Sequence, residues 1–231
     1  MRAVTLDAAG TLFAPREPVG ETYARVARRH GITAEASVVD DRFRRAMRSA
    51  PPLAFPGVAA ARRPAFERAW WASIVATALG VPDADPRLPP CVDALFLRYA
   101  QADAWSVFDD VVPALQALRV HGFGLAVVSN FDGRLPDLLA SLGLAHRFDA
   151  VLWSTMADAA KPAPGIFRLA AHRLDVDVSA TCHVGDDPEA DVAGARAAGA
   201  MAVHLDRRGT PGVSSDVIVT LVELTPWLAK R

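Results

Sequence analysis

The sequence predicts an α/β protein in which a doubly wound parallel sheet carries an inserted helical cap domain. From residue 106 onwards, short apolar runs alternate with segments of helical spacing, which is typical of parallel strands joined by helices. Another apolar run opens the chain and ends in polar residues. The stretch between these regions has helical spacing interrupted by proline-rich breaks. We therefore predict a sheet domain at 1–13 and 106–231 and a helical cap at 14–105.

The first expected strand covers residues 2–7 and delivers a carboxylate at its end. The apolar run Ala3 to Leu6 is followed at once by Asp7, then by a glycine turn and by Thr11. A carboxylate in this position, followed by a turn and a hydroxyl, suits a nucleophile in the crevice of an open α/β sheet. Many such sites carry a second acid two residues later, which protonates the leaving group, but this chain has Ala9 there.

Four helices are expected in the insertion, and glycines and prolines mark their ends. Gly31 and Gly80 follow the first and the third helix, and a proline stands near the start of the third. Two proline-rich segments separate the helices as loops. The aromatic residues Phe66, Trp70 and Trp71 are expected in the core of this domain. The expected helices cover 20–30, 38–49, 64–79 and 91–99, and the expected loops cover 50–57 and 81–90.

In the second part of the chain, apolar runs typical of buried strands alternate with segments of helical spacing, as a doubly wound sheet requires. Apolar runs of four or five residues, long enough for buried strands, are each separated from the next by a helical pattern or a loop. We expect helices at 111–121 and 134–142, from 165, and at 189–198, and strands at 124–128, 150–153, 180–184, 201–205 and 217–219.

Four polar signals follow expected strands of the sheet domain. The carboxyl ends of parallel strands meet at one edge of a sheet, where open α/β sheets bind their ligands. Taken singly, each signal has a simpler explanation, because a strand-terminal Asp is often a helix cap and a Ser-Asn pair is often a turn. Together and in this order they predict an active site. The signals are Asp7 with Thr11, Ser129 with Asn130, Lys161, and Asp186 with Asp187 and Asp191.

These signals resemble the four motifs of the haloacid dehalogenase (HAD) superfamily of hydrolases, which implies a Rossmann-like core. The long helical insertion between the first and second motifs is similar to the cap of its subfamily I. The chain looks closest to a branch of HAD-like hydrolase-domain proteins that often lack the second acid of the first motif. The resemblance covers essentially the whole chain and rests on DAAGTL at 7–12, VVSN at 127–130, KPAPGIF at 161–167 and VGDDPEAD at 184–191.

The resemblance implies a nucleophile and a Mg²⁺ site. Asp7 would attack phosphorus to form an aspartyl-phosphate, and would bind Mg²⁺ together with Asp186. The third protein ligand in the family is the backbone carbonyl two residues after the nucleophile, which Ala9 supplies as well as Asp would. Asp191 would support the metal, or Asp187 would take that place.

The remaining motif residues would bind the phosphoryl group of the substrate. Ser129 would hydrogen-bond the phosphoryl oxygens, with help from Asn130. Lys161 would neutralise the charge of those oxygens and restrain Asp7. The hydroxyl of Thr11 would steady the loop after the first strand.

Ala9 separates this chain from two branches of the same superfamily. The dehalogenases carry Tyr at this position and lack the metal, whereas the pair Asp186-Asp187 here resembles a metal motif. The phosphonoacetaldehyde hydrolases carry Ala, but they need a lysine in the cap for a Schiff base, and residues 14–105 contain no lysine. A phosphatase without the usual acid is therefore the expected activity, and acyl or aryl phosphates are the esters that need it least.

Two residues are candidates to replace the missing acid. Asp132 follows the second motif closely, and Glu21 lies in the cap, where Tyr23 and His30 are further titratable residues. A simpler interpretation of Asp132 is that it caps the helix expected from 134. His183 lies on a strand three residues before the metal motif, and we expect it to serve the packing of the sheet.

Composition and charge limit the choice of partners. The 231 residues are 52% hydrophobic and 22% charged with net charge −1, which gives no indication of nucleic-acid binding. The cap has 13 Arg against 10 acidic residues, and the rest of the chain carries a net charge of −4. This asymmetry would attract a small anionic substrate, although scattered solvated charge explains it equally well.

We expect a cytoplasmic protein that is a monomer or a homodimer. No apolar run reaches the length of a membrane span, and the chain enters a strand at once, without the pattern of a signal peptide. Cys91 and Cys182 are too few for a disulfide framework and lack metal-ligand spacing.

Two functions remain open from the sequence. The first is a Mg²⁺-dependent hydrolase of a small phosphorylated metabolite, because a pure binding protein has no need of a nucleophile such as Asp7. The second is a related protein of little or no turnover that binds a phosphorylated ligand or a partner, because Ala9 removes the usual acid.

Overall fold

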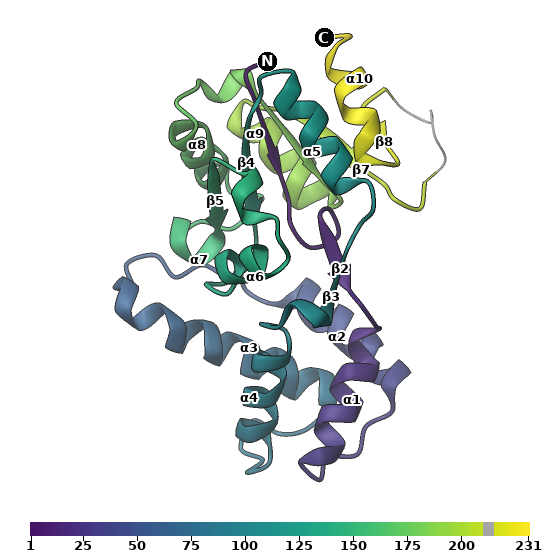
Figure 1. Ribbon diagram of the computed structural model, residues 1–231. Coiled ribbons are helices and arrows are strands. Elements are labelled where there is room, and N and C mark those ends of the chain that lie inside the picture. Colours follow the sequence, from purple (N-terminus) through teal and green to yellow (C-terminus); the bar gives the residue numbers. More distant parts are fainter. Residues whose placement is uncertain (210–214) are drawn as a thin grey trace. The chain divides into compact units, whose positions relative to one another are not determined.

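The computed structural model describes residues 1–209 and 215–231, which form two compact units (Figure 1). The first, called the core unit here, comprises 1–14, 54–57 and 107–231, and the second, called the helical unit, comprises 15–53 and 58–106. A separate two-stranded sheet is formed by β2 (Phe13–Pro15) and β3 (Trp105–Val107). These short strands were not expected from the sequence.

The core unit is built on a six-stranded sheet in the order β5-β4-β1-β6-β7-β8, and all neighbouring pairs are parallel. This confirms the predicted fold class. The chain runs from β1 outwards to β4 and β5 and then returns to β6 on the other side, so the winding direction reverses beside β1. The strands are β1 (Ala3–Leu6), β4 (Gly124–Ser129), β5 (Ala150–Trp153), β6 (Thr181–Gly185), β7 (Met201–Leu205) and β8 (Val217–Ile218).

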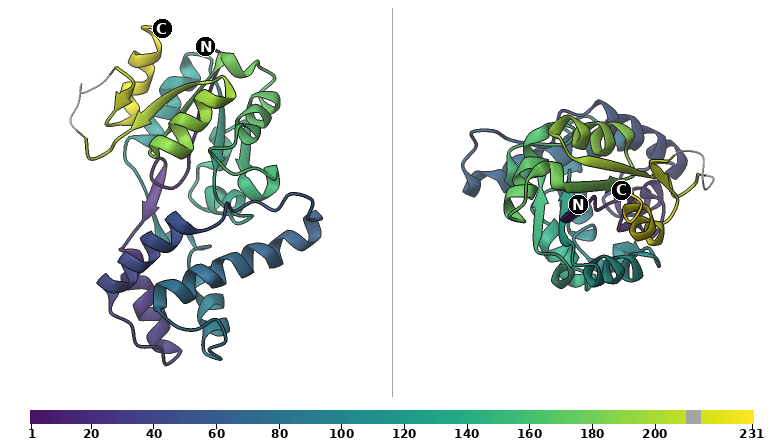
Figure 2. Two further views of the ribbon diagram at one scale, coloured as in Figure 1. Left: turned by 180° about the vertical axis from the view of Figure 1, so that it is seen from behind. Right: turned by 90° about the horizontal axis from the view of Figure 1, so that it is seen from above.

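Helices cover both faces of this sheet. Figures 1 and 2 show α5 on the opposite face from α8 and α9. On the α8–α9 side, Val128 and Leu152 of the sheet pack with Ile166, Phe167 and Ala195 in one buried cluster. The helices of the core unit are α5 (Val111–Val120), α6 (Leu135–Ser141), α7 (Ser154–Ala157), α8 (Pro164–Arg173), α9 (Gly194–Ala198) and α10 (Leu224–Leu228).

The helix expected at 189–198 is not a single α-helix. Its first part, Pro188–Ala193, is a π-helical turn, and only Gly194–Ala198 is α-helical. Such turns are rare and are frequently found at functional sites. Here the wide turn carries Asp191, one of the expected site residues.

The helical unit has a core of its own around four helices. Tyr23, Val39, Val75, Leu79 and Leu95 belong to one buried cluster of this core. Amphipathic spacing explains α1 and α2, whose charged residues are exposed or only partly buried. The helices are α1 (Val19–Arg29), α2 (Ala36–Ser49), α3 (Arg63–Leu79) and α4 (Leu88–Arg98).

The expectation that three aromatic residues form the core of this unit was wrong. Phe66 is exposed, and Trp70 and Trp71 are only partly buried. The two tryptophan rings pack edge to face with centroids 4.9 Å apart, and the Trp70 indole donates to the carbonyl of Pro51. Because α3 carries apolar residues on several sides, the spacing alone did not identify the side that is buried, which includes Ile74.

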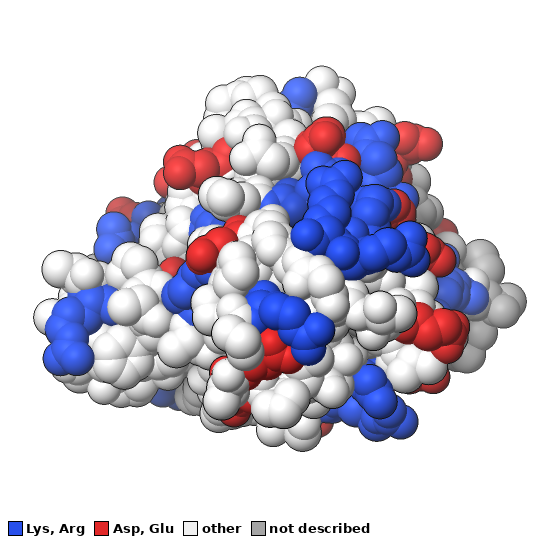
Figure 3. All heavy atoms as spheres, turned by 90° about the horizontal axis from the view of Figure 1, so that it is seen from below, with Lys and Arg blue, Asp and Glu red and all other residues white. Residues whose placement is uncertain are grey.

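Most of the surface charge is mixed. Figure 3 shows basic side chains gathered in one area of one face, with acidic side chains among and around them. In the helical unit, several arginines pair with nearby acids, which weakens the case for a basic surface that attracts an anion. These pairs are Arg25–Glu17, Arg44–Asp41, Arg87–Asp85 and Arg98–Asp103. None of the helices in the described part of the chain combines the length and apolar character that a membrane span requires.

Candidate active site

The polar residues singled out from the sequence gather at the carboxyl edge of the sheet. In the register of β1 with its two neighbours, Leu6 faces Val127 on one side and Val184 on the other. The next residues along these strands therefore emerge together. They include Asp7 after β1 and Ser129 at the end of β4.

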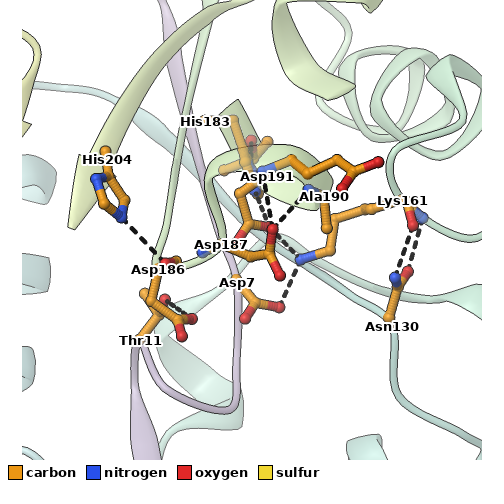
Figure 4. A network of polar contacts seen from close by, with 12 residues as sticks. Asp7, Thr11, Asn130, Lys161, His183, Asp186, Asp187, Ala190, Asp191 and His204 are labelled. Carbon is orange, nitrogen blue, oxygen red and sulfur yellow. Dashed lines mark hydrogen bonds and ion pairs between the residues drawn. The ribbon is translucent and has the colours of Figure 1, made fainter. Parts of the chain in front are cut away.

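A buried lysine joins two of the expected carboxylates. The ammonium of Lys161 donates to Oδ1 of Asp7 at 2.6 Å and to Oδ1 of Asp191 at 2.5 Å (Figure 4). These side chains are almost completely buried. Asp186 completes the cluster, because one oxygen each of Asp7, Asp186 and Asp191 lies within 4.8 Å of the others. The cluster thus contains three carboxylates and one ammonium.

This charge imbalance appears in the pKa values of the cluster. Burial raises the pKa of Asp7, against the attraction of Lys161. Burial and the negative charges of Asp7 and Asp191 raise the pKa of Asp186 to about 6. Despite its burial, Asp191 has a pKa held well below its usual value by Lys161 and by a hydrogen bond from His183. The cluster is therefore short of positive charge next to Asp7 and Asp186.

Two glycines let the carboxylates come close to the backbone. Gly10 has φ of +91°, in the left-handed region that favours glycine, and a Cβ there would collide with the carboxylate of Asp186. A Cβ on Gly185 would collide with the side chain of Asp191. Any larger residue at either position would displace an acid of the cluster.

Thr11 connects the loop after β1 with the fourth motif. Its hydroxyl donates to Oδ1 of Asp186 at 3.3 Å. Its carbonyl accepts a hydrogen bond of 2.7 Å from Arg207, which also forms two 3.0 Å hydrogen bonds to the carboxylate of Asp110. Arg207 therefore fixes the same loop from outside the cluster. Sequence reasoning missed this residue, because nothing distinguishes it from the other arginines of the chain.

Asp187 and Asp191, which the sequence left as alternatives, have different contacts. Oδ1 of Asp187 accepts from the amides of Glu189 and Ala190, both at 2.8 Å, so this carboxylate caps the π-helical turn. Asp191 points into the cluster instead, and its Oδ2 accepts from the amide of Asp187 at 3.0 Å. The geometry thus favours Asp191 as the acid that supports a metal.

Asn130 binds the backbone of Lys161. Its Nδ2 donates to the carbonyl of Lys161 at 2.8 Å, and its Oδ1 accepts from the amide of Lys161 at 2.7 Å. These two bonds tie the second motif to the third. Ser129 is buried at the end of β4, on the same edge of the sheet. The expectation that both side chains bind phosphoryl oxygens stays a prediction.

The hypothesis that Asp132 replaces the missing acid is not supported by its surroundings. Asp132 is completely buried, and its carboxylate accepts from the amide, Nε and Nη2 of Arg134 at 3.0, 2.8 and 2.5 Å. These contacts close the turn before α6, but the N-cap of that helix is Arg134 without a side-chain cap hydrogen bond, so the expectation that Asp132 caps it was wrong. In the helical unit, Tyr23 is buried in the core and Glu21 is exposed.

His183 does more than pack the sheet. Its Nε2 lies 3.1 Å from Oδ1 of Asp191, and its Nδ1 lies 2.8 Å from the hydroxyl of Thr5. Burial lowers the pKa of the imidazole, although Asp191 opposes this shift. The expectation of a purely packing role was therefore incomplete.

The donors of the cluster fit a small divalent cation. Hard cations such as Mg²⁺ prefer carboxylate and carbonyl oxygens, and the cluster offers three carboxylates in one place. Burial and nearby negative charge raise the pKa of Asp7 and Asp186, and a cation beside these two carboxylates would favour their ionised forms. The residues present thus fit the metal that the motif resemblance implies.

Comparison with known proteins identifies the family. A model of the haloacid dehalogenase-like hydrolases matches residues 1–199. The chain belongs to this family. A mouse haloacid dehalogenase-like hydrolase domain-containing protein 3 is 40% identical over 202 residues, which cover 86% of this chain and 79% of that protein. The recognition of a HAD-like hydrolase from its four motifs is confirmed.

Two further proteins similar to this chain are phosphatases by name. The phosphoserine phosphatase of Thermus thermophilus is 37% identical over 107 residues, 45% of this chain and 42% of that protein. The crystal structure of a HAD phosphatase from Thermococcus onnurineus is 25% identical and has a TM-score of 0.68, covering 99% of this chain and 98% of that one. Hydrolysis is thus the reaction class of this chain.

Proposed function

We propose that this HAD-like hydrolase is a Mg²⁺-dependent phosphatase that acts on a small phosphorylated metabolite through Asp7. The observation that carries this proposal is the buried lysine bridge, in which one ammonium holds Asp7 and Asp191 beside a third carboxylate. A nucleophile held by a cation, next to a group of hard oxygen ligands, suits transfer of an anionic phosphoryl group. The names of the two phosphatase relatives support the same class of substrate.

In the proposed reaction, the carboxylate of Asp7 attacks phosphorus and the bond from phosphorus to the leaving-group oxygen breaks. Water then attacks the aspartyl-phosphate, which releases phosphate and restores the carboxylate. Lys161 holds Asp7 in place and neutralises charge on the transferred group, and Ser129 donates to its oxygens. Asp7, the carbonyl of Ala9 and Asp186 would hold the Mg²⁺, with Asp191 as a further carboxylate. The bound ion would supply positive charge for the phosphoryl oxygens.

Ala9 restricts the substrates that such a site can use. A methyl group cannot protonate a departing alkoxide, and a placed general acid contributes about 10²- to 10⁴-fold. The proposed site therefore favours acyl or aryl phosphates, whose leaving groups depart without full protonation. The same residue favours the second candidate, a low-turnover protein that binds a phosphorylated ligand or a partner.

We also propose that the helical unit acts as a cap that selects the substrate, and that the protein is cytoplasmic. The two cysteines, Cys91 and Cys182, are both free and buried. Burial raises the pKa of Cys91 to about 11 and that of Cys182 to about 12, so neither thiol ionises readily. Free, unreactive thiols suit a reducing compartment.

Steady-state hydrolysis of para-nitrophenyl phosphate and acetyl phosphate, with and without Mg²⁺, tests the proposal. We expect turnover only with Mg²⁺, and its loss in Asp7→Asn. Ala9→Asp should accelerate an alkyl phosphate, whose leaving group needs a proton, by about 10²-fold. A wild type that is inert while Ala9→Asp is active would instead support the binding protein.

A further inference from the structure

A chain of buried polar groups extends from the nucleophile into the middle of the sheet. Lys161 contacts Asp191, Asp191 contacts His183, and His183 contacts Thr5. Thr5 and His183 are directly opposite each other in the parallel register of β1 and β6. Each of these side chains is at most 5% exposed. A buried network of this kind rigidifies its members when every one of them is satisfied.

The hydrogen bonds assign a role to each nitrogen of the imidazole. A carboxylate can only accept, so Nε2 must carry the proton that it shares with Asp191. In a neutral ring Nδ1 is then an acceptor, and the Thr5 hydroxyl donates to it. Thr5 therefore fixes the tautomer of His183 that can donate to Asp191.

Asp191 is held on both of its carboxylate oxygens. Oδ1 accepts from Lys161 and from His183, and Oδ2 accepts from the amide of Asp187. The backbone sets the position of Oδ2, and His183 sets the rotation that aims Oδ1 at the ammonium. Without His183, one of the two donors that orient Oδ1 is lost.

We propose that His183, with its tautomer fixed by Thr5, is a positioning residue that holds Asp191 so that Lys161 stays on the nucleophile Asp7. The inference rests on the proposed function, since it assigns a use to the lysine bridge of the same site. It goes beyond the four motifs, because neither strand residue belongs to them.

A packing role makes a different prediction. The ring of His183 also contacts Phe167 edge to face, with centroids 5.0 Å apart, so it fills space beneath α8. If filling space is its only use, substitutions should change the stability of the protein according to their volume and should leave the position of Lys161 unchanged. If the donor at the Nε2 position matters, the substitution that keeps this donor should behave like the wild type.

Gln and Asn provide this matched pair. The amide nitrogen of His183→Gln takes the place of Nε2 and can donate to Asp191, whereas the shorter amide of His183→Asn takes the place of Nδ1 and reaches only towards Thr5. We expect His183→Asn to form the aspartyl-phosphate about 10- to 100-fold more slowly than His183→Gln, the effect of one hydrogen bond to a charged group. KM should change less than kcat, because the altered group orients the nucleophile.

The two lysines of the chain allow a measurement that does not depend on turnover. Lysine-selective ¹³C labelling gives ε-methylene NMR signals only from Lys161 and Lys230, and Lys230→Arg assigns them. The Lys161 signal should shift in His183→Asn and stay close to its wild-type position in His183→Gln. The signal of the exposed Lys230 should stay unchanged in both variants and serves as the internal control.

These readouts separate the inference from the proposed function. A wild type that forms no aspartyl-phosphate would contradict the proposed function, while the shift of the Lys161 signal would still support the positioning of the lysine. Equal rates and equal Lys161 shifts in the two His183 variants would overturn the inference.

If the His183 variants do not fold, Thr5→Val and Thr5→Ser take their place. Valine should shift the Lys161 signal, and serine, which keeps the hydroxyl, should not; equal spectra would contradict the inference.

Discussion

Two acid–base clusters of the core unit are built from similar groups but differ in charge balance. The Asp7 cluster contains Asp7, Asp186 and Asp191 with one ammonium from Lys161. The Asp110 cluster contains one carboxylate and one guanidinium, and the carboxylate also accepts from the hydroxyl of Thr220 and the amide of Leu221, both at 2.7 Å. The first cluster is thus deficient in positive charge, and the second is neutral.

The pKa values follow this difference. Burial raises the pKa of Asp7 and Asp186, whereas Asp110 keeps a lowered pKa despite its burial because Arg207, Thr220 and Leu221 donate to it. The guanidinium of Arg207 also stacks over the ring of Phe108, 3.8 Å from its centroid. A neutral pair whose carboxylate accepts from several donors stabilises a fold, whereas a cluster with surplus negative charge suits a further cation. The charge balance thus distinguishes Asp110 from the acids of the proposed metal site.

The largest effect is expected from removing the one positive charge of the Asp7 cluster. Lys161→Met leaves three carboxylates without a cation and should destabilise the metal-free protein by about 3–5 kcal/mol at pH 7. Chemical denaturation measures this loss. Lys230→Met, at the other and exposed lysine, should change the stability by less than about 0.5 kcal/mol. Equal effects of the two variants would mean that the bridge stabilises nothing.

The next effect concerns the response to Mg²⁺. At a concentration near 100 times its Kd, the ion should stabilise the wild type by about 2.7 kcal/mol. Asp186→Asn should abolish most of this response in a thermal-shift measurement. It should also raise the stability of the metal-free protein near pH 7, because a carboxylate with a raised pKa is destabilising when ionised.

Asp187→Asn is the matched control for the Mg²⁺ response. Asn is also a good capping residue, so this change should preserve the start of the π-helical turn and leave the response to Mg²⁺ intact. Loss of the response in Asp187→Asn, with retention in Asp186→Asn, would reverse the assignment of the two acids.

The sequence predicts those site residues that a local pattern marks, but not contacts between residues far apart along the chain. Asp7 could be found because it directly follows a strand, and Lys161 because it lies on the segment that leads from a strand to the next long helix. Parallel strands bring such segments to one edge of a sheet. The link between Thr5 and His183 joins residues 178 positions apart through strand register, which no local pattern reveals. Arg207 is likewise defined only by its partners.

A smaller effect is expected in the neutral cluster, and it depends on pH. Asp110→Asn should cost about 1–2 kcal/mol at pH 7 through loss of charged hydrogen bonds. The folded pKa of Asp110 is lowered, so its contribution is fully present above the unfolded value near 4 and disappears as the pH falls below it. Denaturation of wild type and variant between pH 7 and pH 3 checks this convergence.

Asp149→Asn provides the comparison for that experiment. Asp149 accepts two hydrogen bonds from Arg119, but this pair is much more exposed than the pair of Asp110 and Arg207. Its loss should therefore cost less, about 0–1 kcal/mol. A larger cost for Asp149→Asn would show that burial does not distinguish the two pairs.

Acid-quenched trapping of the covalent intermediate tests the central claim most directly. The protein is incubated with acetyl phosphate and Mg²⁺, stopped in acid, digested and mapped by mass spectrometry. The account predicts one phosphoryl group on the peptide that contains Asp7, and none in Asp7→Asn or without Mg²⁺. Hydrolysis of acetyl phosphate with no phosphoryl group on Asp7, or with the label on another residue, would contradict it.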